Sequence, residues 1–283
     1  MKKGIALLLA TLMCLSLTAC GGTGEQSSGQ DSSGEDTAAP DYPTTNISCI
    51  IPYGAGGTMD QLSRALFQSL SEDALPSNVN FVVENVAGGG GLVGTEQGLT
   101  RAADGVGVNG DLIINRAIGA TDIVLQEDFT PIVCLQDEPY CLIGPADGDC
   151  STLEGFINKL SSGDNAVTVA ITGLGSPGGL ATIALSNAFG CQIRTVTYDS
   201  SNDCALAVVT GECDATFINV SGVAGQIEAG TLKLLAVTSA EESDSLPGTP
   251  SLAQTYPEEC GDMDLRSVCF LGIRSDADPA IIE

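Results

Sequence analysis

Short apolar runs, glycine-rich turns and amphipathic stretches alternate along most of the chain. The run at residues 47–51 predicts a buried strand, and a glycine-rich turn at residues 52–60 follows it. A strand at residues 79–84 then leads into a second glycine turn at residues 88–94. This repetition of strand, turn and helix is typical of a parallel α/β sheet. In such sheets ligands bind beyond the carboxyl ends of the strands.

The first glycine turn, residues 52–60, has features of an anion-binding site. Its glycines allow close approach of the backbone, and the amides at the start of the following helix point outward. Thr58 and Gln61 have the spacing of a capping box, so we predict that the helix begins at Thr58. Asp60 lies in the first helical turn, where it either caps its own helix or faces the ligand. The predicted buried stripe of this helix comprises Leu62, Leu66 and Leu70.

The second half of the chain repeats this pattern. A strand at residues 166–172 precedes a third glycine turn at residues 173–179. Ser176 and Pro177 suit the N-cap and the first position of the next helix, which Gly190 ends. The predicted buried face of this helix comprises Leu180, Ile183, Ala184 and Ala188. Further strands are predicted at residues 193–198, 215–219, 232–238 and 268–273, with a short helix at residues 203–210.

The charge of the chain excludes several classes of function. Its 283 residues carry 10 Lys and Arg against 36 Asp and Glu, which gives a net charge of −26. Nucleic-acid binding is excluded, since no basic surface can neutralise a row of phosphates. The chain has no histidine, which excludes Ser-His-Asp triads, Cys-His dyads and histidine-ligated metals. Lys159 and Lys233 are the only lysines beyond the N-terminal segment, and neither lies in a catalytic motif, so the composition favours binding over catalysis.

The N-terminal segment has the pattern of an export signal. Two lysines precede an apolar stretch at residues 5–17, and Leu-Thr-Ala-Cys at residues 17–20 closes it. This tetrapeptide resembles the lipobox of bacterial lipoproteins, whose cysteine is lipidated once the signal peptide, here residues 1–19, is removed. We therefore predict that Cys20 carries lipid and that residues 20–45 form a flexible acidic Gly/Ser tether. A plain signal peptide and an uncleaved anchor are the alternatives.

Of the 11 cysteines, nine follow Cys20, and an odd number cannot pair completely within one chain. Cys49 and Cys269 lie in apolar strands, where we expect buried thiols. No Cys-x-x-Cys motif supports a zinc or redox site. Three pairs share the same spacing and are candidate disulfides: Cys141/Cys150, Cys204/Cys213 and Cys260/Cys269.

Two nucleotide-binding motifs are matched only in part. The first glycine turn lacks the lysine of a Walker A loop. Residues 173–178 match G-x-G-x-x-G, but Pro177 removes one amide and no acidic residue ends the next strand. The glycines of an isolated turn would serve only to reverse the chain. Two such turns beside the hydroxyls of Thr58 and Ser176 favour ligand binding instead.

Seven short motifs follow one another along the chain, at residues 51–60, 83–88, 103–105, 128–132, 173–176, 211–214 and 232–238. In this order they resemble the extracytoplasmic solute-binding proteins of tripartite tricarboxylate transporters, the Bug family. The resemblance runs from about Ile47 to Ile282. It implies an α/β, periplasmic-binding-protein-like two-domain clamshell (Venus flytrap), with the ligand between the halves. The expected domain 1 comprises residues 46–144 with 265–283, and domain 2 comprises residues 145–264.

The resemblance also implies a ligand site. Family members hold a carboxylate through backbone amides and hydroxyls of two facing turns, which correspond here to the first and third glycine turns. Tyr198 is expected to line the cleft too. No catalytic residue, metal or cofactor is implied. The predicted ligand-binding residues are therefore Tyr53, Ala55, Gly56, Gly57, Thr58, Asp60, Gly173, Leu174, Gly175, Ser176, Pro177 and Tyr198.

Three departures from the family pattern bear on the substrate. The family's Tyr-Lys-Gly is Tyr-Asp-Ser at residues 198–200, and the usual histidine after the third turn is Gly179. The arginine that family members usually have after the Ala-Val-Thr-Ser segment, here residues 236–239, is missing, and Glu241 and Glu242 stand there instead. These changes leave neutral and zwitterionic ligands open. Because family members continue beyond the position of Glu283, we also expect a C-terminal truncation, either of the gene or as a fragment.

Taken together, these patterns predict an extracytoplasmic solute-binding lipoprotein, lipid-anchored to the bacterial cell membrane. It would capture a small carboxylate and pass it to the membrane permease subunits of a tripartite transporter. An orphan clamshell that serves as a sensor for a signalling partner is the alternative. An exported enzyme is a third hypothesis, against which the missing histidine and the lack of a suitably placed lysine argue.

Overall fold

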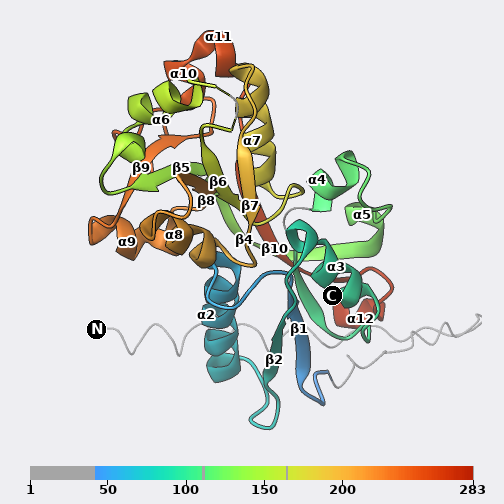
Figure 1. The fold of residues 1–283 in the computed structure, drawn as a ribbon. Coiled ribbons are helices and arrows are strands. Elements are labelled where there is room, and N and C mark those ends of the chain that lie inside the picture. Colours follow the sequence, from blue (N-terminus) through green and yellow to red (C-terminus); the bar gives the residue numbers. More distant parts are fainter. Residues whose placement is uncertain (1–41, 110–111, 164, 283) are drawn as a thin grey trace, which may run out of the picture. The chain divides into compact units, whose positions relative to one another are not determined.

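The computed structural model describes residues 42–109, 112–163 and 165–282 (Figure 1). The predicted signal peptide, Cys20 and most of the predicted tether lie outside the described residues. The described residues belong to one contact unit and contain two five-stranded sheets. This architecture confirms the predicted α/β class and provides one sheet for each half of the expected clamshell.

The first sheet has the strand order β2-β1-β3-β10-β4. β1 (Ile47–Ile51), the apolar run of the sequence, pairs in parallel with β2 (Phe81–Asn85) and with β3 (Val106–Asn109). β10 (Arg266–Arg274) runs antiparallel to β3 and to β4 (Phe129–Pro139). The sheet is therefore mixed, because its last strand returns from the other half of the chain.

The second sheet has the strand order β7-β6-β8-β5-β9. β6 (Thr168–Ile171) pairs in parallel with β7 (Arg194–Thr197) and β8 (Ala215–Ile218), as the repeated strand-turn-helix pattern predicts. β5 (Cys141–Pro145) is antiparallel to β8 and to β9 (Leu232–Val237). The three parallel strands end at the same edge of the sheet, where a ligand site is expected.

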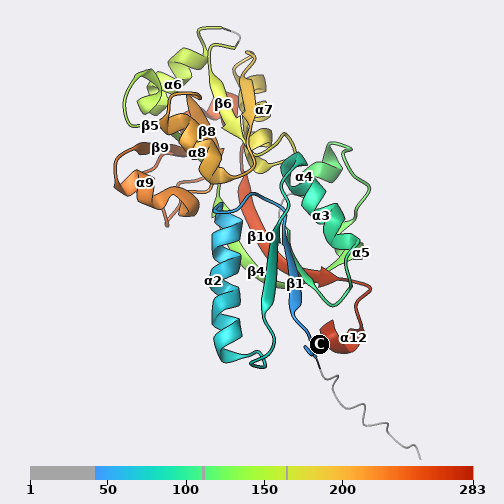
Figure 2. The same cartoon turned by 60° about the horizontal axis from the view of Figure 1, so that its bottom comes forward.

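The chain passes from the first sheet to the second at Tyr140, which lies between β4 and β5. The predicted boundary after residue 144 placed most of β5 in the first domain. This placement needs correction, because Leu142 of β5 pairs with Phe217 of β8 and Ala236 of β9. The chain returns through β10, which lies beside β4 in the first sheet (Figure 2).

Helices connect the strands of both sheets. In the first half they are α2 (Thr58–Asp73), η1 (Gly89–Gly91), α3 (Leu92–Leu99), α4 (Leu112–Ala117), α5 (Leu125–Asp128) and, after β10, α12 (Pro279–Ile282). In the second half they are η2 (Asp149–Ser151), α6 (Leu153–Leu160), α7 (Pro177–Ala188), α8 (Ser201–Val209), η3 (Ser221–Val223), α9 (Ala224–Glu228), α10 (Leu252–Thr255) and α11 (Pro257–Cys260). None of the helices within the described ranges has the length and apolar character needed to cross a bilayer.

The buried faces of α2 and α7 are shifted from the predicted ones. Phe67 of α2 stacks on Phe81 of β2 with ring centroids 4.2 Å apart, and this contact fixes which side of the helix is buried. Leu62, Leu66 and Leu70 are only partly buried, whereas the buried positions of α2 are Thr58, Met59, Asp60, Ser63 and Phe67. In α7 the buried positions are Ala181, Thr182 and Leu185, whereas the predicted Ile183 is 40% exposed.

None of the three predicted disulfides is present, since Cys141, Cys150, Cys204, Cys213 and Cys260 are all buried thiols. Cys49 is a buried thiol as predicted. Cys141 and Cys150 belong to different hydrophobic cores, which lie on the two faces of the second sheet. Burial raises the pKa of the Cys150 thiol to about 11 and that of Cys204 to about 12, so both stay protonated and unreactive at neutral pH.

Two glycines of α3 provide a test of its packing. A Cβ at Gly94 would lie 2.6 Å from the Cα of Pro52 and from the carbonyl oxygen of Val86, whereas a Cβ at Gly98 meets nothing within 4 Å. We expect Gly94→Ala to lower the free energy of unfolding by about 1–3 kcal/mol through overpacking. Gly98→Ala should raise it by about 0.5–1 kcal/mol through helix propensity. Urea denaturation distinguishes the two, and equal effects would contradict close packing of α3 on β1.

Candidate functional site

A small cavity lies where the carboxyl ends of strands from both sheets meet. Its volume is about 20 Å³, which is room for about one water molecule. The cavity is lined by Tyr53, Gly57, Thr58, Met59, Tyr140, Thr172, Ser201 and Asn219. The first four come from the first glycine turn and the start of α2. Tyr140 lies between the two sheets, and the last three lie at the ends of β6 and β8 and at the start of α8.

The position of each lining residue follows from the local fold. Tyr53 comes soon after β1, Thr172 directly follows β6, and Asn219 directly follows β8. Thr58 and Ser201 are the first residues of α2 and α8. The cavity therefore occupies the place where parallel sheets bind ligands, at strand ends and helix starts.

Two polar atoms at this cavity have no hydrogen-bond partner in the described structure. They are Oγ1 of Thr58 and Nδ2 of Asn219, on residues that are only 4% and 5% exposed. A buried polar group without a partner costs about 1–3 kcal/mol, and such groups are rare in native proteins. Both groups can donate a hydrogen bond, so the pair is suited to an acceptor such as a carboxylate.

No lining side chain of the cavity is charged. An anion bound here would be held by neutral donors, namely the hydroxyl of Thr58 and the amide of Asn219. The first-turn amides of α2 and α8 have no partner within their own helices, and each helix dipole places partial positive charge at its start. Helix starts of this kind bind anions without a cationic side chain.

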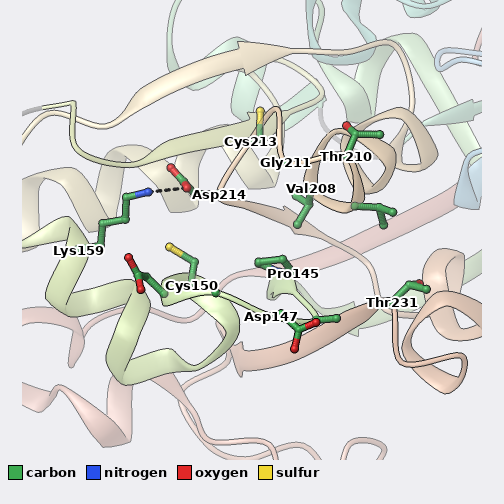
Figure 3. Close-up of a pocket in the computed structure, with 14 residues that line it drawn as sticks. Pro145, Asp147, Cys150, Lys159, Val208, Thr210, Gly211, Cys213, Asp214 and Thr231 are labelled. Carbon is green, nitrogen blue, oxygen red and sulfur yellow. Dashed lines mark hydrogen bonds and ion pairs between the residues drawn. The ribbon is translucent and has the colours of Figure 1, made fainter.

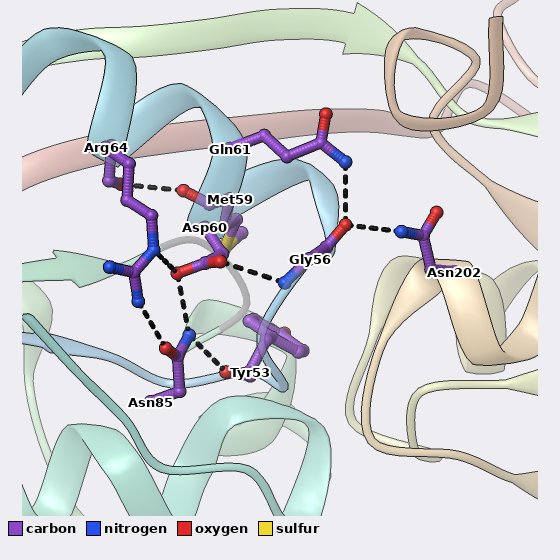
Figure 4. Close-up of polar contacts among 9 residues, drawn as sticks. Tyr53, Gly56, Met59, Asp60, Gln61, Arg64, Asn85 and Asn202 are labelled. Atoms are coloured by element: carbon purple, nitrogen blue, oxygen red, sulfur yellow. Dashed lines mark hydrogen bonds and ion pairs between the residues drawn. The ribbon is translucent and has the colours of Figure 1, made fainter. Parts of the chain in front are cut away.

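Asp60 holds the first glycine turn together (Figure 4). Its Oδ2 accepts a hydrogen bond from the Gly56 amide at 2.8 Å. Its Oδ1 accepts from Nε of Arg64 at 2.7 Å and from Nδ2 of Asn85 at 3.0 Å. The same amide group of Asn85 also donates to the Tyr53 carbonyl at 3.0 Å. Of the two roles left open by the sequence, the structure therefore gives Asp60 the structural one.

The predicted capping box at Thr58 and Gln61 is not formed. Gly57 is the N-cap of α2, and no side chain caps it. Nε2 of Gln61 donates instead to the Gly56 carbonyl at 2.6 Å. Because the Asp60 network already orders the turn, the hydroxyl of Thr58 is left at the cavity rather than used as a cap.

The first glycine turn contacts the start of α8. The Gly54 amide donates to the Asp199 carbonyl at 2.8 Å. Nδ2 of Asn202 donates to the Gly56 carbonyl at 2.6 Å, and Figure 4 shows it pointing from α8 toward the turn. These two hydrogen bonds join the two halves beside the cavity.

The third glycine turn instead faces the second one. A Cβ at Gly173 would lie 2.6 Å from the Gly90 amide nitrogen, and one at Gly90 would lie 2.9 Å from the Gly175 carbonyl carbon. Gly90 has a φ of 65° and Gly173 a φ of 140°, which other residues rarely adopt. Nδ2 of Asn115 lies between the turns, 3.1 Å from the Gly90 carbonyl oxygen and 3.4 Å from that of Gly175.

The remaining predicted site residues have other surroundings. The hydroxyl of Ser176 is fully buried, caps α7 through the Gly179 amide and donates to the Gly173 carbonyl, while Pro177 is the first residue of α7. Ala55 and Leu174 are exposed. The hydroxyl of Tyr198 lies 3.8 Å from Sγ of Cys213, and its pKa is raised by burial and by hydrogen bonds to Cys213 and Glu212.

Five lining residues were missed from the sequence: Met59, Tyr140, Thr172, Ser201 and Asn219. Two of them could have been found, because Thr172 and Asn219 are the last residues of the strands predicted at residues 166–172 and 215–219. Ser201 begins α8, but its helix was predicted to start two residues later. Tyr140 gave no signal, since the crossing between the sheets was placed further along the chain.

A larger pocket of about 410 Å³ lies near the start of β6 and β8 (Figure 3). Nζ of Lys159 lies 2.7 Å from Oδ1 of Asp214, and this hydrogen bond raises the pKa of Lys159. The other oxygen of Asp214 accepts from the Thr168 amide. Asp147 and Asp149 add negative charge, so this pocket is poorly suited to an anion.

Two comparisons of the amino-acid sequence agree, one with a family model and one with curated relatives. A family model described as "Tripartite tricarboxylate transporter family receptor" matches residues 64–270. Protein BugT of Bordetella pertussis is 29% identical over 231 residues, which cover 78% of this chain and 69% of BugT. The chain spans between 61% and 69% of the length of three curated relatives that it matches.

Solved structures show the same fold. The R. palustris protein Rpa4515, solved with adipate, has a TM-score of 0.74 and 24% identity, with 86% of this chain and 81% of that chain covered. The periplasmic binding protein BugD has a TM-score of 0.73 and 20% identity, with 85% and 80% covered. The fold is therefore that of two-domain periplasmic binding proteins.

The role of Asp60 can be tested by Asp60→Asn. The asparagine replaces an acceptor oxygen by a donor, so at least one of the three hydrogen bonds is lost. We expect the free energy of unfolding to fall by about 1–3 kcal/mol. Asp73→Asn is the matched control, because Asp73 is exposed at the end of the same helix, where losing a negative charge is neutral or slightly stabilising. Urea denaturation showing equal effects would contradict the structural role.

Proposed function

The chain belongs to the family of tripartite tricarboxylate transporter receptors, and we propose that it captures a small organic carboxylate outside the cytoplasm. The bound solute would pass to the membrane permease subunits of such a transporter. No covalent step is involved, and the binding site would be the cavity between the two sheets. The adipate in the structure of Rpa4515 supports a carboxylate as the class of ligand.

The observation that carries the proposal is the pair of unpartnered donors at the cavity. Thr58 Oγ1 comes from one half of the fold and Asn219 Nδ2 from the other. A carboxylate placed between them accepts one hydrogen bond per oxygen and removes the penalty of two buried unsatisfied groups. Ligand binding would therefore stabilise contact between the two halves.

Ligand entry requires the two halves to separate. The cavity of about 20 Å³ is too small for an organic acid. The hydrogen bonds from Gly54 to Asp199 and from Asn202 to Gly56 are the contacts beside it that would have to open. We propose that β4 and β10, the two strands next to the points where the chain crosses between sheets, flex as the hinge of this motion.

We propose further that the mature protein is held at the membrane by lipid on Cys20. The sequence supports this through the lipobox-like residues 17–20 and the polar tether that follows. A tethered receptor stays close to its permease, which raises its effective concentration there. An extracytoplasmic location follows from the same signal and suits a receptor of this family.

Replacement of the unpartnered hydroxyl tests the site. We expect Thr58→Val to weaken binding of the best carboxylate in a panel of butyrate, succinate, adipate and citrate by about 10-fold or more, since a hydrogen bond to a charged group is lost. The ligand-free melting temperature should stay unchanged or rise, because valine keeps the shape and removes a buried unsatisfied group. Isothermal titration calorimetry and thermal unfolding measure the two quantities.

The matched control is Thr210→Val at the opposite end of α8, where the threonine hydroxyl bonds only to carbonyls of its own helix. Its affinity should equal that of the unmodified protein. Asn219→Leu tests the second donor in the same way. Unchanged affinity in both Thr58→Val and Asn219→Leu would sink the proposed site.

The lipid anchor is tested by Cys20→Ala in a bacterial host that processes lipoproteins. We expect the variant to lose incorporation of labelled fatty acid and to leave the membrane fraction. Cys14→Ala, which changes a cysteine within the apolar stretch of the signal, should leave both unchanged. Membrane association that persists in Cys20→Ala would point to an uncleaved anchor.

A further inference from the structure

We propose that this receptor selects organic acids that carry one carboxylate and no other charged group. The proposal rests on the function proposed above and specifies its substrate class. It would set this chain apart from the adipate-bound relative, because adipate carries two carboxylates. The argument depends on how many donors and which charges surround the cavity.

The two buried and unpartnered side-chain donors at the cavity match the two oxygens of one carboxylate. Thr58 Oγ1 and Asn219 Nδ2 are buried and unpartnered, and they come from different halves of the fold. The Tyr53 hydroxyl already donates to the Gly90 carbonyl at 3.2 Å. Met59 and the rings of Tyr53 and Tyr140 supply apolar wall. A ligand with a carboxylate at one end and no charge elsewhere fits this distribution of polar and apolar groups.

No cationic side chain is placed to receive a second carboxylate. The nearest in sequence is Arg64, whose Nε and Nη2 are bound to Asp60 and Asn85. The other basic residues of the described ranges are either paired or exposed away from the cavity lining: Arg101, Arg116, Lys159, Arg194, Lys233, Arg266 and Arg274. A second carboxylate would have to lose water without gaining a partner of opposite charge.

The electrostatic field of the whole protein also disfavours a second carboxylate. The net charge of −26 opposes every additional negative charge that a ligand brings into the cleft. Local donors offset this opposition for a first carboxylate, because they touch it directly. A second carboxylate meets the unfavourable field without a cationic side chain in the cavity lining.

None of the residues that line the cavity is an aspartate or glutamate that could receive an ammonium group. Both oxygens of Asp60 are occupied by the Gly56 amide, Arg64 and Asn85. Oδ2 of Asp203 accepts from the Ser200 hydroxyl. Amino acids are therefore disfavoured, although the sequence alone left zwitterionic ligands open.

Matched ligands test the proposal without changing the protein. Butyrate, succinate and monomethyl succinate have similar lengths but differ in the second charge. By calorimetry we expect butyrate and the monomethyl ester to bind at least about 10-fold more tightly than succinate at low salt. The gap should narrow when the salt rises from about 20 mM to about 500 mM, since screening weakens the repulsion.

A variant supplies the missing cation. Ser201→Lys places an ammonium group at the edge of the cavity, and we expect the butyrate-to-succinate affinity ratio to fall by about 10-fold or more. Ser201→Gln has similar reach without charge and reports the effect of size alone, so the ratio should be at least about 10-fold lower in Ser201→Lys than in Ser201→Gln. A ratio that is the same in all three proteins would overturn the charge argument.

The outcomes separate the two proposals. Succinate that binds the unmodified protein as tightly as butyrate, with binding weakened by Thr58→Val, overturns the single-carboxylate proposal and keeps the carboxylate receptor. If none of these acids, nor adipate or citrate, binds at millimolar concentration, the proposed function itself fails. Tight binding of a neutral amide such as butyramide would overturn both.

Discussion

The Asp60 carboxylate is the interaction on which the site depends. It accepts hydrogen bonds from the Gly56 amide, Arg64 and Asn85, and so ties the first glycine turn to α2 and to the end of β2. Since this network orders the start of α2, the Thr58 hydroxyl is not needed as a cap. It lies at the cavity without a partner, ready for a ligand. A buried structural charge thereby makes a neutral donor available for binding.

Backbone atoms make several of the contacts between the two halves. Gly90 approaches Gly173 and Gly175 so closely that a Cβ at Gly90 or Gly173 would meet main-chain atoms within 3 Å. The first turn and the start of α8 likewise meet through the Gly54 amide and the Gly56 carbonyl. The anion site that we propose likewise relies on neutral donors and helix starts, because no lining residue is a cation and the net charge of the chain is −26.

Short-range sequence patterns predicted the local elements well, but they did not predict that the second glycine turn packs against the third. β1, the start of α2 and the Ser176 cap of α7 follow from short-range patterns, and the structure confirms them. The pairing of the second turn with the third is a contact between residues more than 80 positions apart, made by glycines that carry no side-chain signal. The buried face of α2 shifted because Phe67 stacks on Phe81, a tertiary contact that outweighs the leucine spacing.

The residues of the glycine motifs differ from the residues whose donors are unpartnered at the cavity. Ser176 stands in the most conspicuous motif, yet its hydroxyl is fully committed to Gly173 and Gly179. Asn219 stands in no motif, yet its amide is buried and unpartnered at the strand end where ligands bind. Groups that build a binding site must be satisfied in the protein alone, whereas groups that bind the ligand must not be. In the site that we propose, the specificity residues are therefore the unpartnered buried donors rather than the glycine turns.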